Sequence, residues 1–270
     1  MATAGAAISD DARELDLELD DVGKTFAGPA GDVVALSGIS LSARRGELIS
    51  VLGPSGCGKT TILRLIAGLE APTSGIIRVQ GRALQQDRRP ETSDLGVVFQ
   101  EARLLPWFDI EENVALPLRL RGVGREQRLD KARKLLTLVG LEGFERVMPD
   151  HLSGGMKQRA AIARALIVEP RLLLLDEPFG ALDAMTRDLM NVELQRIRQA
   201  MACTTLLITH SIAEAVFLGD RVLAMTPRPG RIAKVFDVPF PHPRDLDLQS
   251  TAEFQALVKD LRRLMTGWHK

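Results

Sequence analysis

The sequence predicts an α/β fold with one inserted helical segment, and three observations along its 270 residues support this. A glycine-rich loop at residues 53–60 stands between a short apolar run and a helical pattern. Two later apolar runs, residues 172–175 and 206–208, lack alternation, which is typical of parallel strands covered on both faces. From about residue 101 to 150 the apolar periodicity is helical. Strands that give way to helices and then resume indicate a core with an inserted sub-domain.

The segment before the glycine-rich loop is typical of strands and turns. Residues 15–19 alternate strictly between apolar and acidic side chains, which predicts a half-buried antiparallel strand. A loop with glycine and proline is expected at residues 27–32, followed by strands at 35–41 and 47–52. After the loop and its helix, strand character resumes at residues 76–79. These elements predict an antiparallel sheet near the phosphate-binding loop.

The loop itself reads GPSGCGKT, which matches the phosphate-binding pattern G-x-x-x-x-G-K-[ST]. Glycines let the backbone fold tightly enough for its N–H groups to point at phosphate oxygens. The helix expected at residues 61–67, with Gly68 as its cap, adds the positive end of its dipole. Lys59 can reach the β- and γ-phosphates, and the Thr60 hydroxyl can join a Mg²⁺ shell. The alternative is a structural glycine turn. The expected nucleotide contacts here are Gly53, Pro54, Ser55, Gly56, Cys57, Gly58, Lys59, Thr60 and Thr61.

Two acidic residues end the apolar run at residues 172–175. Ligands sit at the carboxyl ends of strands in open α/β sheets, so Asp176 is placed to hold Mg²⁺ through water. Glu177 is placed to take a proton from an attacking water. The alternative is that both acids simply end a strand in solvent.

A second anion site is expected at residues 152–156, which read LSGGM. Ser153 is a good helix N-cap, and Gly154 and Gly155 open the first turn. A purely structural cap is the alternative, although two glycines in a first turn are costly to helix stability.

Composition restricts the classes of partner. Lys and Arg number 35, as do Asp and Glu, so the chain as a whole has no basic footprint for nucleic acid. The two cysteines, Cys57 and Cys203, have no metal-ligand spacing and indicate a reduced, cytosolic protein. No apolar stretch reaches the ~18 residues that span a bilayer, so any membrane passage requires another chain. Residues 1–14 are expected to be a flexible tail and no signal or transit peptide.

With these motifs in place, residues 15–235 resemble the nucleotide-binding subunit of an ATP-binding cassette (ABC) transporter. The resemblance implies a P-loop, RecA-like ABC ATPase core with an antiparallel β sub-domain and a helical sub-domain at about residues 101–160. It also implies a dimer, expected to be of two identical chains, that sandwiches two ATP molecules. In that dimer the signature LSGGM of one subunit meets the γ-phosphate held by the other. The fifth signature residue is Met156 rather than glutamine, which leaves Ser153 and Gly154 in place.

The same resemblance assigns roles to four further residues. Gln100 stands where the family's glutamine loop touches Mg²⁺, and Asp183 lies in the loop that crosses the dimer. His210 resembles the switch histidine that contacts the γ-phosphate. Phe26 resembles the aromatic residue that stacks on adenine, with a core phenylalanine as the alternative. The expected catalytic residues are thus Glu177 and His210, and the expected Mg²⁺ contacts are Thr60, Gln100 and Asp176.

Residues 101–114, 214–222 and 227–232 resemble the importer group that handles nitrate, sulfonates and taurine, together with related pyrimidine-precursor importers. The implied partners are transmembrane permease subunits and, indirectly, an extracytoplasmic solute-binding protein, with the chain peripheral at the cytoplasmic face of the inner membrane. Trp107, beside Leu104 and Leu105, is expected to receive a short helix from a permease, or else to sit in a hydrophobic turn. The alternatives are a soluble ABC-type ATPase not coupled to transport and a lipid or export ABC system.

Residues 236–270 are expected to form a C-terminal extension with a short amphipathic helix. Its apolar face either packs on its own domain or binds a partner. That face consists of Phe254, Leu257, Val258, Leu261, Leu264 and Met265.

Overall fold

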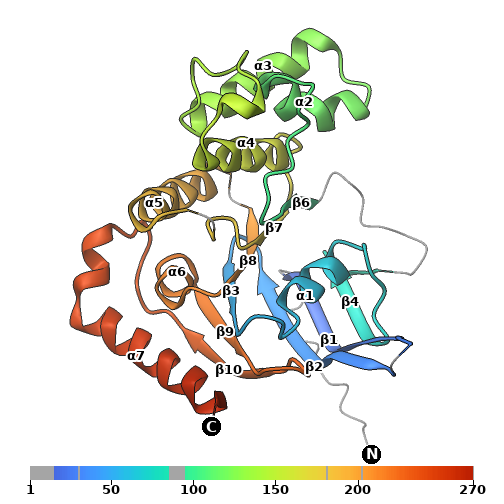
Figure 1. Cartoon of the computed structure of the whole chain (residues 1–270), viewed down its shortest axis with the longest axis vertical. Coiled ribbons are helices and arrows are strands. Elements are labelled where there is room, and N and C mark those ends of the chain that lie inside the picture. The colour runs from blue at the N-terminus through green and yellow to red at the C-terminus, as the bar shows by residue number, and fades with distance from the viewer. Residues whose placement is uncertain (1–14, 30, 85–94, 181, 202, 270) are drawn as a thin grey trace, which may run out of the picture.

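The computed structural model describes residues 15–29, 31–84, 95–180, 182–201 and 203–269, so the tail expected at residues 1–14 lies outside it. Two β-sheets lie side by side, and helices cover the larger one (Figure 1). The larger sheet has six strands in the order β10-β9-β3-β8-β7-β6, and the smaller has four in the order β2-β1-β4-β5. The fold class is therefore α/β with an antiparallel sheet attached, as predicted.

The six-stranded sheet is parallel except for its edge strand β10. Its strands are β3 (Leu48–Leu52), β6 (Leu95–Val98), β7 (Leu172–Asp176), β8 (Thr204–Thr209), β9 (Arg221–Met225) and β10 (Ile232–Asp237). The unbroken apolar runs of β7 and β8 are buried along their whole length, which confirms the prediction of parallel strands covered on both faces. The boundary expected after residue 235 falls inside β10, because this strand pairs with β9 as far as Asp237.

Successive leucines of β7 serve two different cores. Leu173 and Leu175 face a large apolar cluster built with the helices, whereas Leu172 and Leu174 face a second cluster that includes residues of the smaller sheet. Side chains alternate across a strand, so a run of leucines is the pattern that fills both sides of a sheet. The sheet is thus the partition between the two cores.

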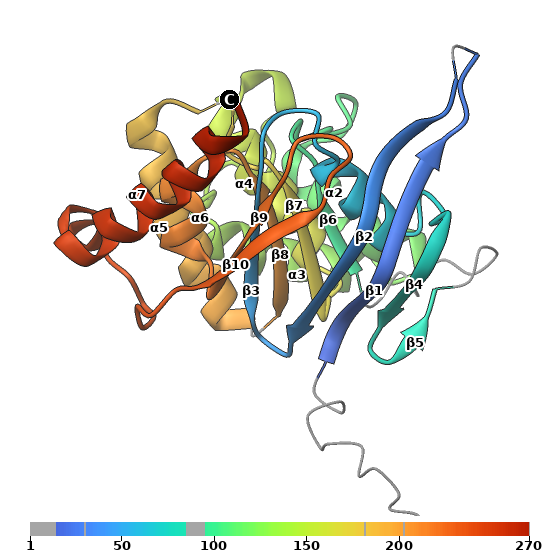
Figure 2. The ribbon, with the colours of Figure 1, turned by 90° about the horizontal axis from the view of Figure 1, so that it is seen from below.

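The smaller sheet is antiparallel throughout. Its strands are β1 (Leu15–Phe26), β2 (Val33–Arg44), β4 (Ser74–Val79) and β5 (Arg82–Ala83). The alternation at residues 15–19 does form a strand, but β1 continues to Phe26 through irregular register shifts against β2. Figure 2 shows β1 and β2 as a long ribbon running past the end of the six-stranded sheet.

Seven α-helices lie within the described ranges. They are α1 (Lys59–Ile66), α2 (Ile110–Leu120), α3 (Arg125–Leu138), α4 (Gly154–Leu166), α5 (Ala184–Met201), α6 (Ile212–Leu218) and α7 (Ala252–Thr266), with 3-10 turns at Pro149–His151, Leu246–Ser250 and Gly267–His269. Helices α2, α3 and α4 gather at one end of the molecule, beyond β6 (Figure 1). Helix α1 begins at Lys59, two residues before the predicted start, because Gly58 adopts a φ of 105° that turns the chain directly into the helix. Across the ranges listed above, no helix is both long and apolar enough to span a bilayer.

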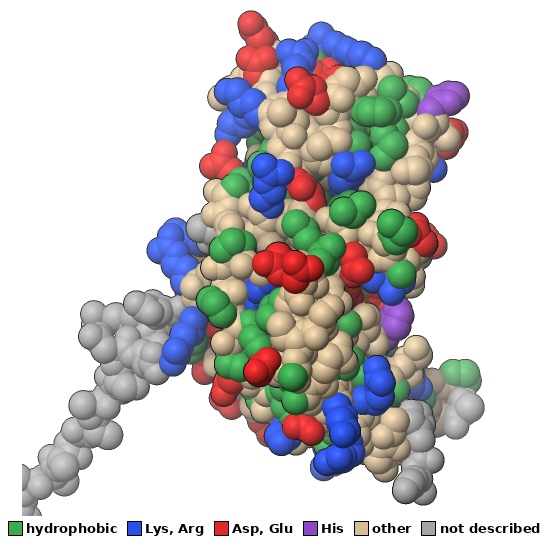
Figure 3. Space-filling model, turned by 90° about the vertical axis from the view of Figure 1, so that its left-hand side faces the viewer, with side chains coloured by type: hydrophobic (Ala, Val, Ile, Leu, Met, Phe, Trp, Pro, Cys, Tyr) green, Lys and Arg blue, Asp and Glu red, His purple; other side chains and the backbone are tan. Residues whose placement is uncertain are grey.

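The C-terminal helix α7 packs on its own domain, which decides between the two alternatives for its apolar face. Phe254, Val258 and Leu261 are buried in the same apolar cluster as Phe217 of α6. Figure 1 shows α7 along the side of α6. On the face that carries α7, acidic and basic side chains are interspersed (Figure 3), in keeping with the zero net charge.

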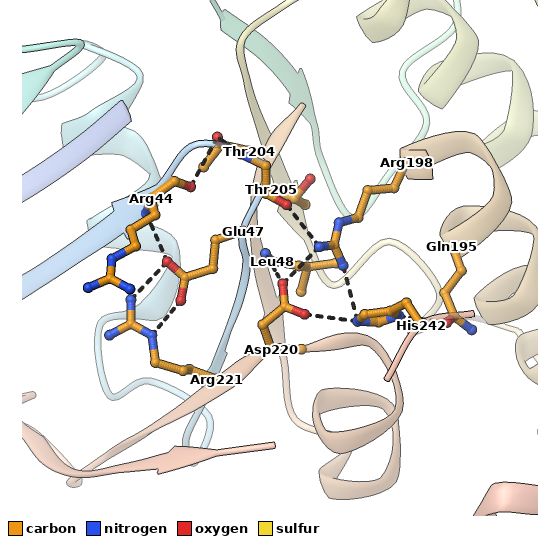
Figure 4. A network of polar contacts seen from close by, with 12 residues as sticks. Arg44, Glu47, Leu48, Gln195, Arg198, Thr204, Thr205, Asp220, Arg221 and His242 are labelled. Atoms are coloured by element: carbon orange, nitrogen blue, oxygen red, sulfur yellow. Dashed lines mark hydrogen bonds and ion pairs between the residues drawn. The ribbon is translucent and has the colours of Figure 1, made fainter. Parts of the chain in front are cut away.

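A polar network anchors the C-terminal segment to the six-stranded sheet (Figure 4). The Asp220 carboxylate accepts hydrogen bonds from the Leu48 N–H at 2.7 Å and from Arg198 at 2.8 Å, and it lies 2.9 Å from His242 Nε2. His242 Nδ1 lies 3.0 Å from Gln195 Oε1 of α5. Burial by itself would raise the pKa of the Asp220 carboxyl. The hydrogen bonds from His242 and Leu48 and the charge of Arg198 outweigh burial and hold that pKa below its usual value.

Replacing Asp220 by Asn should lower the free energy of unfolding by about 2 kcal/mol at pH 7, because the amide nitrogen would face donors. A carboxyl with a lowered pKa stabilises the folded state above its unfolded pKa of ~4 and loses that effect as pH falls through the folded value. The gap between wild type and Asp220→Asn in urea unfolding should therefore shrink below about pH 4. Asp237→Asn, at the exposed end of β10, is the matched control. An equal gap at pH 3 and pH 7 would contradict the role given to Asp220.

Candidate active site

Three parallel strands end at the same level and bring the predicted site residues together. Leu52 of β3 pairs with Thr209 of β8, and Asp176 of β7 pairs with Ile208. The next residue of each strand is therefore delivered to one edge of the sheet: Gly53, His210 and Glu177. Parallel pairing thus brings the loop after Gly53 together with Glu177 and His210, which follow it by more than a hundred residues in the sequence.

A cavity of about 460 Å³ opens at this edge. Phe26, Ser55, Gly56, Gly58, Lys59, Thr60, Thr61, Gln100 and Glu177 line it, as do Val33, Ala35 and Arg228. The first nine were expected in the site, and the last three were not. Pro54, Cys57 and Asp176 lie next to lining residues in the chain, and Gly53 contacts the lining residue Lys59 through its carbonyl oxygen. Ser153, Gly154, Gly155 and Asp183 lie outside the cavity lining.

The glycine-rich loop carries the site's buried cation. Lys59 is only 5% exposed, and its ammonium donates to the carbonyl oxygens of Gly53 at 2.8 Å and Pro54 at 3.1 Å. Gly56 and Gly58 have φ angles of 75° and 105°, a region that favours glycine. The loop is therefore held around a positive charge that faces the cavity, an arrangement suited to phosphate.

Asp176 and Thr60 form the expected metal position. The Thr60 hydroxyl lies 3.3 Å from Asp176 Oδ1. Burial raises the pKa of Asp176, against the opposing effects of the Thr60 hydrogen bond and the Lys59 charge. A buried carboxylate beside a hydroxyl is the donor set that Mg²⁺ shares with substrate phosphates. Across the described ranges there is no group of three His, Cys, Asp or Glu side chains that could hold a metal ion.

Glu177 lies between His210 and Lys59. Its Oε2 is 3.1 Å from His210 Nδ1 and its Oε1 is 3.9 Å from the Lys59 ammonium. The residue adopts a φ of 45°, which costs a non-glycine residue about 1–3 kcal/mol and is held by surrounding structure. The Glu177 N–H donates to the Ile208 carbonyl at 2.8 Å. The strained backbone thus keeps the carboxylate over the glycine-rich loop.

The position of His210 is supported by residues that sequence reasoning missed. The Thr209 hydroxyl accepts from the Ser211 N–H at 3.0 Å and hydrogen-bonds to the Glu214 carboxylate. Glu214 is 5% exposed, and burial raises the pKa of its carboxyl. This contact ties the residues on both sides of His210 to the start of α6. The signal in the sequence was a single acidic residue in a short apolar helix.

The segments around Gln100 and Glu177 are held by side chains of α4 and α5. Gln158 donates to the Phe99 carbonyl at 3.3 Å, and Arg164 donates to the carbonyls of Arg103 and Ala102 at 2.8 Å each. Both Gln158 and Arg164 come from α4. Arg187 of α5 in turn donates to the Leu182 carbonyl at 2.8 Å, next to Asp183. No sequence motif marked these three side chains.

Ser153 caps α4 as predicted: its hydroxyl accepts from the Met156 N–H at 3.3 Å. Ser153 and Gly154 are exposed. The Leu182 side chain lies beside both signature glycines, 3.9 Å and 3.8 Å from where a Cβ on Gly154 or Gly155 would stand. The capped helix end and the Asp183 loop therefore form one surface, separate from the cavity.

Phe26 is 37% exposed at the wall of the cavity, and the Lys24 ammonium lies 4.8 Å from its ring centroid. It is therefore no core phenylalanine. Its position leaves ring surface open to the cavity, where a base could stack.

Comparisons with known proteins agree with this geometry. The family model described as "ABC transporter" matches residues 36–180. The chain belongs to the ABC transporter family. It is 44% identical to the nitrate import ATP-binding protein NrtD of Synechocystis over 84% of each chain. It is 47% identical to the taurine import ATP-binding protein TauB of Burkholderia pseudomallei, over 78% of this chain and 80% of that one.

Among solved structures, the fold matches a dimeric post-hydrolysis state of the ATP-binding cassette MJ0796 bound to ADP and Pi. The TM-score is 0.74 at 31% identity, over 83% of this chain and all of that one. As an ABC cassette, the chain is an ATPase that uses ATP and Mg²⁺, and its P-loop fold is that predicted.

The loop cysteine bears on solvent access to the site. Cys57 is 1% exposed, lies in the apolar cluster shared with the smaller sheet, and has its pKa raised by burial. Cys203 is also buried with a raised pKa. At pH 7 the native protein should therefore react with maleimide at least about tenfold more slowly than an exposed cysteine, as followed by intact mass. Protein unfolded in urea, the control, should take up two labels. Rapid labelling of Cys57 in the native chain, located by peptide mass, would contradict its burial.

Proposed function

We propose that the chain is the ATP-hydrolysing subunit of an ABC importer for a small oxyanion or sulfonate such as nitrate or taurine. The convergence of Lys59, Thr60, Glu177 and His210 on one sheet edge supports the ATPase part. Similarity to nitrate and taurine import subunits over most of the chain supports the importer part.

ATP binds with its phosphates against the backbone N–H groups of residues 53–60 and the ammonium of Lys59. The base stacks on Phe26. Thr60, Asp176 and Gln100 would hold a Mg²⁺ ion, which would supply neutralisation of charge on the transferring group. Lys59 is already held in place by two carbonyls, so little reorganisation is needed when the phosphate arrives.

Glu177 orients a water molecule and takes its proton. His210, 3.1 Å from the Glu177 carboxylate, donates to the transferring phosphoryl group and holds Glu177 in position. Positioning and charge neutralisation supply most of the rate in phosphoryl transfer. The φ of 45° at Glu177 is the structural cost of that placement.

The surface formed by Ser153, Gly154 and Asp183, with Gly155 behind it, meets the cavity of a second subunit. The exposed serine hydroxyl and the N–H groups at the start of α4 form an anion site suited to the partner's γ-phosphate. We infer that two copies of this chain form the closed pair, each completing the other's site.

Permease subunits dock beside α2, at the cytoplasmic side of a membrane. Trp107 is 67% exposed on a loop that the buried Asn113 holds rigidly, since its amide bonds to the Leu105 and Phe108 carbonyls at 3.0 Å and 2.9 Å. A large apolar side chain presented on a fixed loop suits an incoming helix. The extracytoplasmic solute-binding protein contacts the permease and not this chain.

Glu177→Gln should bind ATP with wild-type affinity, lower turnover by at least about 100-fold and accumulate as an ATP-dependent dimer. The amide keeps the shape of the carboxylate but accepts no proton. Phosphate release and size-exclusion chromatography measure both effects. Glu142→Gln, on an exposed loop, is the control and should behave as wild type. Wild-type turnover in Glu177→Gln would remove the general-base role.

Tagged Glu177→Gln, added with ATP to membranes of the source organism, should retain a multi-spanning permease identified by mass spectrometry. Adding Trp107→Ala should lower permease recovery about tenfold, because a central aromatic contact is worth roughly 1–2 kcal/mol or more. Val235→Ala, an exposed apolar residue on β10, is the matched control. Recovery of soluble or ribosomal proteins alone would favour an ATPase not coupled to transport, and an export permease would overturn the importer part.

A further inference from the structure

The nucleotide cavity has a wall that comes from the C-terminal part of the chain. Arg228 lies in the turn between β9 and β10, yet it lines the same cavity as Phe26 and Lys59. It is exposed, and its guanidinium brings a second positive side chain to a cavity whose other lining cation is Lys59.

The turn that carries Arg228 is docked firmly on the glycine-rich loop and on β2. The Gly230 N–H donates to the Ala35 carbonyl at 2.9 Å, and the Ser37 N–H donates to the Gly230 carbonyl at 3.0 Å. A Cβ on Gly230 would stand 2.1 Å from the Cys57 carbonyl oxygen, so only glycine fits this approach. The backbone on either side of Arg228 is therefore fixed relative to the loop.

Arg228 holds the loop through one carbonyl. Its Nε and Nη2 donate to the Gly56 oxygen at 3.3 Å and 3.1 Å. The carbonyl and the N–H of a trans peptide point in opposite directions, so fixing the Gly56 oxygen also fixes the following Cys57 N–H. That N–H donates across the loop to the Pro54 carbonyl oxygen, with 3.4 Å between N and O. The Arg228 guanidinium, which lies outside the loop, thus sets the direction of the Cys57 N–H inside it.

We propose that Arg228 is a positioning residue for nucleotide binding, which orients the Gly56 peptide of the phosphate-binding loop and adds positive charge at the cavity wall. This rests on the proposed function, in which the cavity holds ATP. The contact is at Gly56, in the middle of the loop, while the γ-phosphate is assigned to Lys59, His210 and the partner's signature. Arg228 therefore serves ATP and ADP alike, and it acts on binding more than on turnover.

The test compares Arg228→Ala and Arg228→Lys with Arg231→Ala, an exposed arginine of the same turn. Calorimetry measures Kd for Mg-ATP and Mg-ADP, phosphate release measures kcat at saturating ATP, and thermal unfolding without nucleotide reports the fold. Arg228→Ala should weaken both nucleotides about tenfold, as expected for loss of a charged hydrogen-bond donor. Arg228→Lys should lower both affinities about threefold, because an ammonium keeps the positive charge but not the paired donors of a guanidinium. Arg231→Ala should stay within about twofold.

For both Arg228 variants, kcat should remain within about twofold of wild type and the unfolding temperature without nucleotide within about 3 °C. Unchanged affinity in Arg228→Ala would overturn the proposal. So would a loss confined to ATP, which would place Arg228 at the γ-phosphate, or a loss that follows the unfolding temperature in both variants. Failure of the wild-type chain to bind either nucleotide would instead remove the proposed function, and this inference with it.

Discussion

The parallel pairing of β3, β8 and β7 determines where the glycine-rich loop, Asp176, Glu177 and His210 lie. Neighbouring strands in this sheet end within one residue of each other, so the segments after Leu52, Asp176 and Thr209 start from a common edge. A slip of one residue in this register would turn each strand's side chains to the opposite face. The leucines of β7 oppose such a slip, because each one packs in one of two separate apolar cores and would have to leave it.

Much of the fold and the centre of the site could be predicted because their signals are local. The unbroken leucines before Asp176 require burial on both faces, and the spacing of GPSGCGKT encodes a loop closed around phosphate. The groups that support the site could not be predicted. Gln158 and Arg228 bond to backbone carbonyls that are 59 and 172 residues away. Every residue has a backbone carbonyl, so the sequence does not mark which one a distant side chain will bond. The start of α1 was wrong by two residues because a glycine, rather than a polar cap, begins the helix.

The site keeps its charges partly compensated. Lys59 rests on two carbonyls and near Glu177, Glu177 also meets His210, and Asp176 has the Thr60 hydroxyl. None of these contacts is a close, fully neutralised ion pair, which would have to be broken before phosphate could bind. The buried charges therefore remain available to a ligand with the opposite sign. Before the ligand binds, the backbone carbonyls lower the free-energy cost of burying the Lys59 ammonium.

Helix α4 connects Ser153, at its N-terminus, to the backbone beside Gln100. At its N-terminus, α4 carries the exposed Ser153, which in the proposed function meets a second subunit. Further along the helix, Gln158 and Arg164 donate hydrogen bonds to backbone carbonyls of residues 99–103, which precede the Trp107 loop. Because a helix is stiff along its axis, a displacement at one end of α4 also displaces its other end. In the proposed function, a movement of the Ser153 end would therefore also move the Trp107 loop. A permease docked at that loop would then respond to nucleotide bound between two subunits, with no change in the fold of either domain.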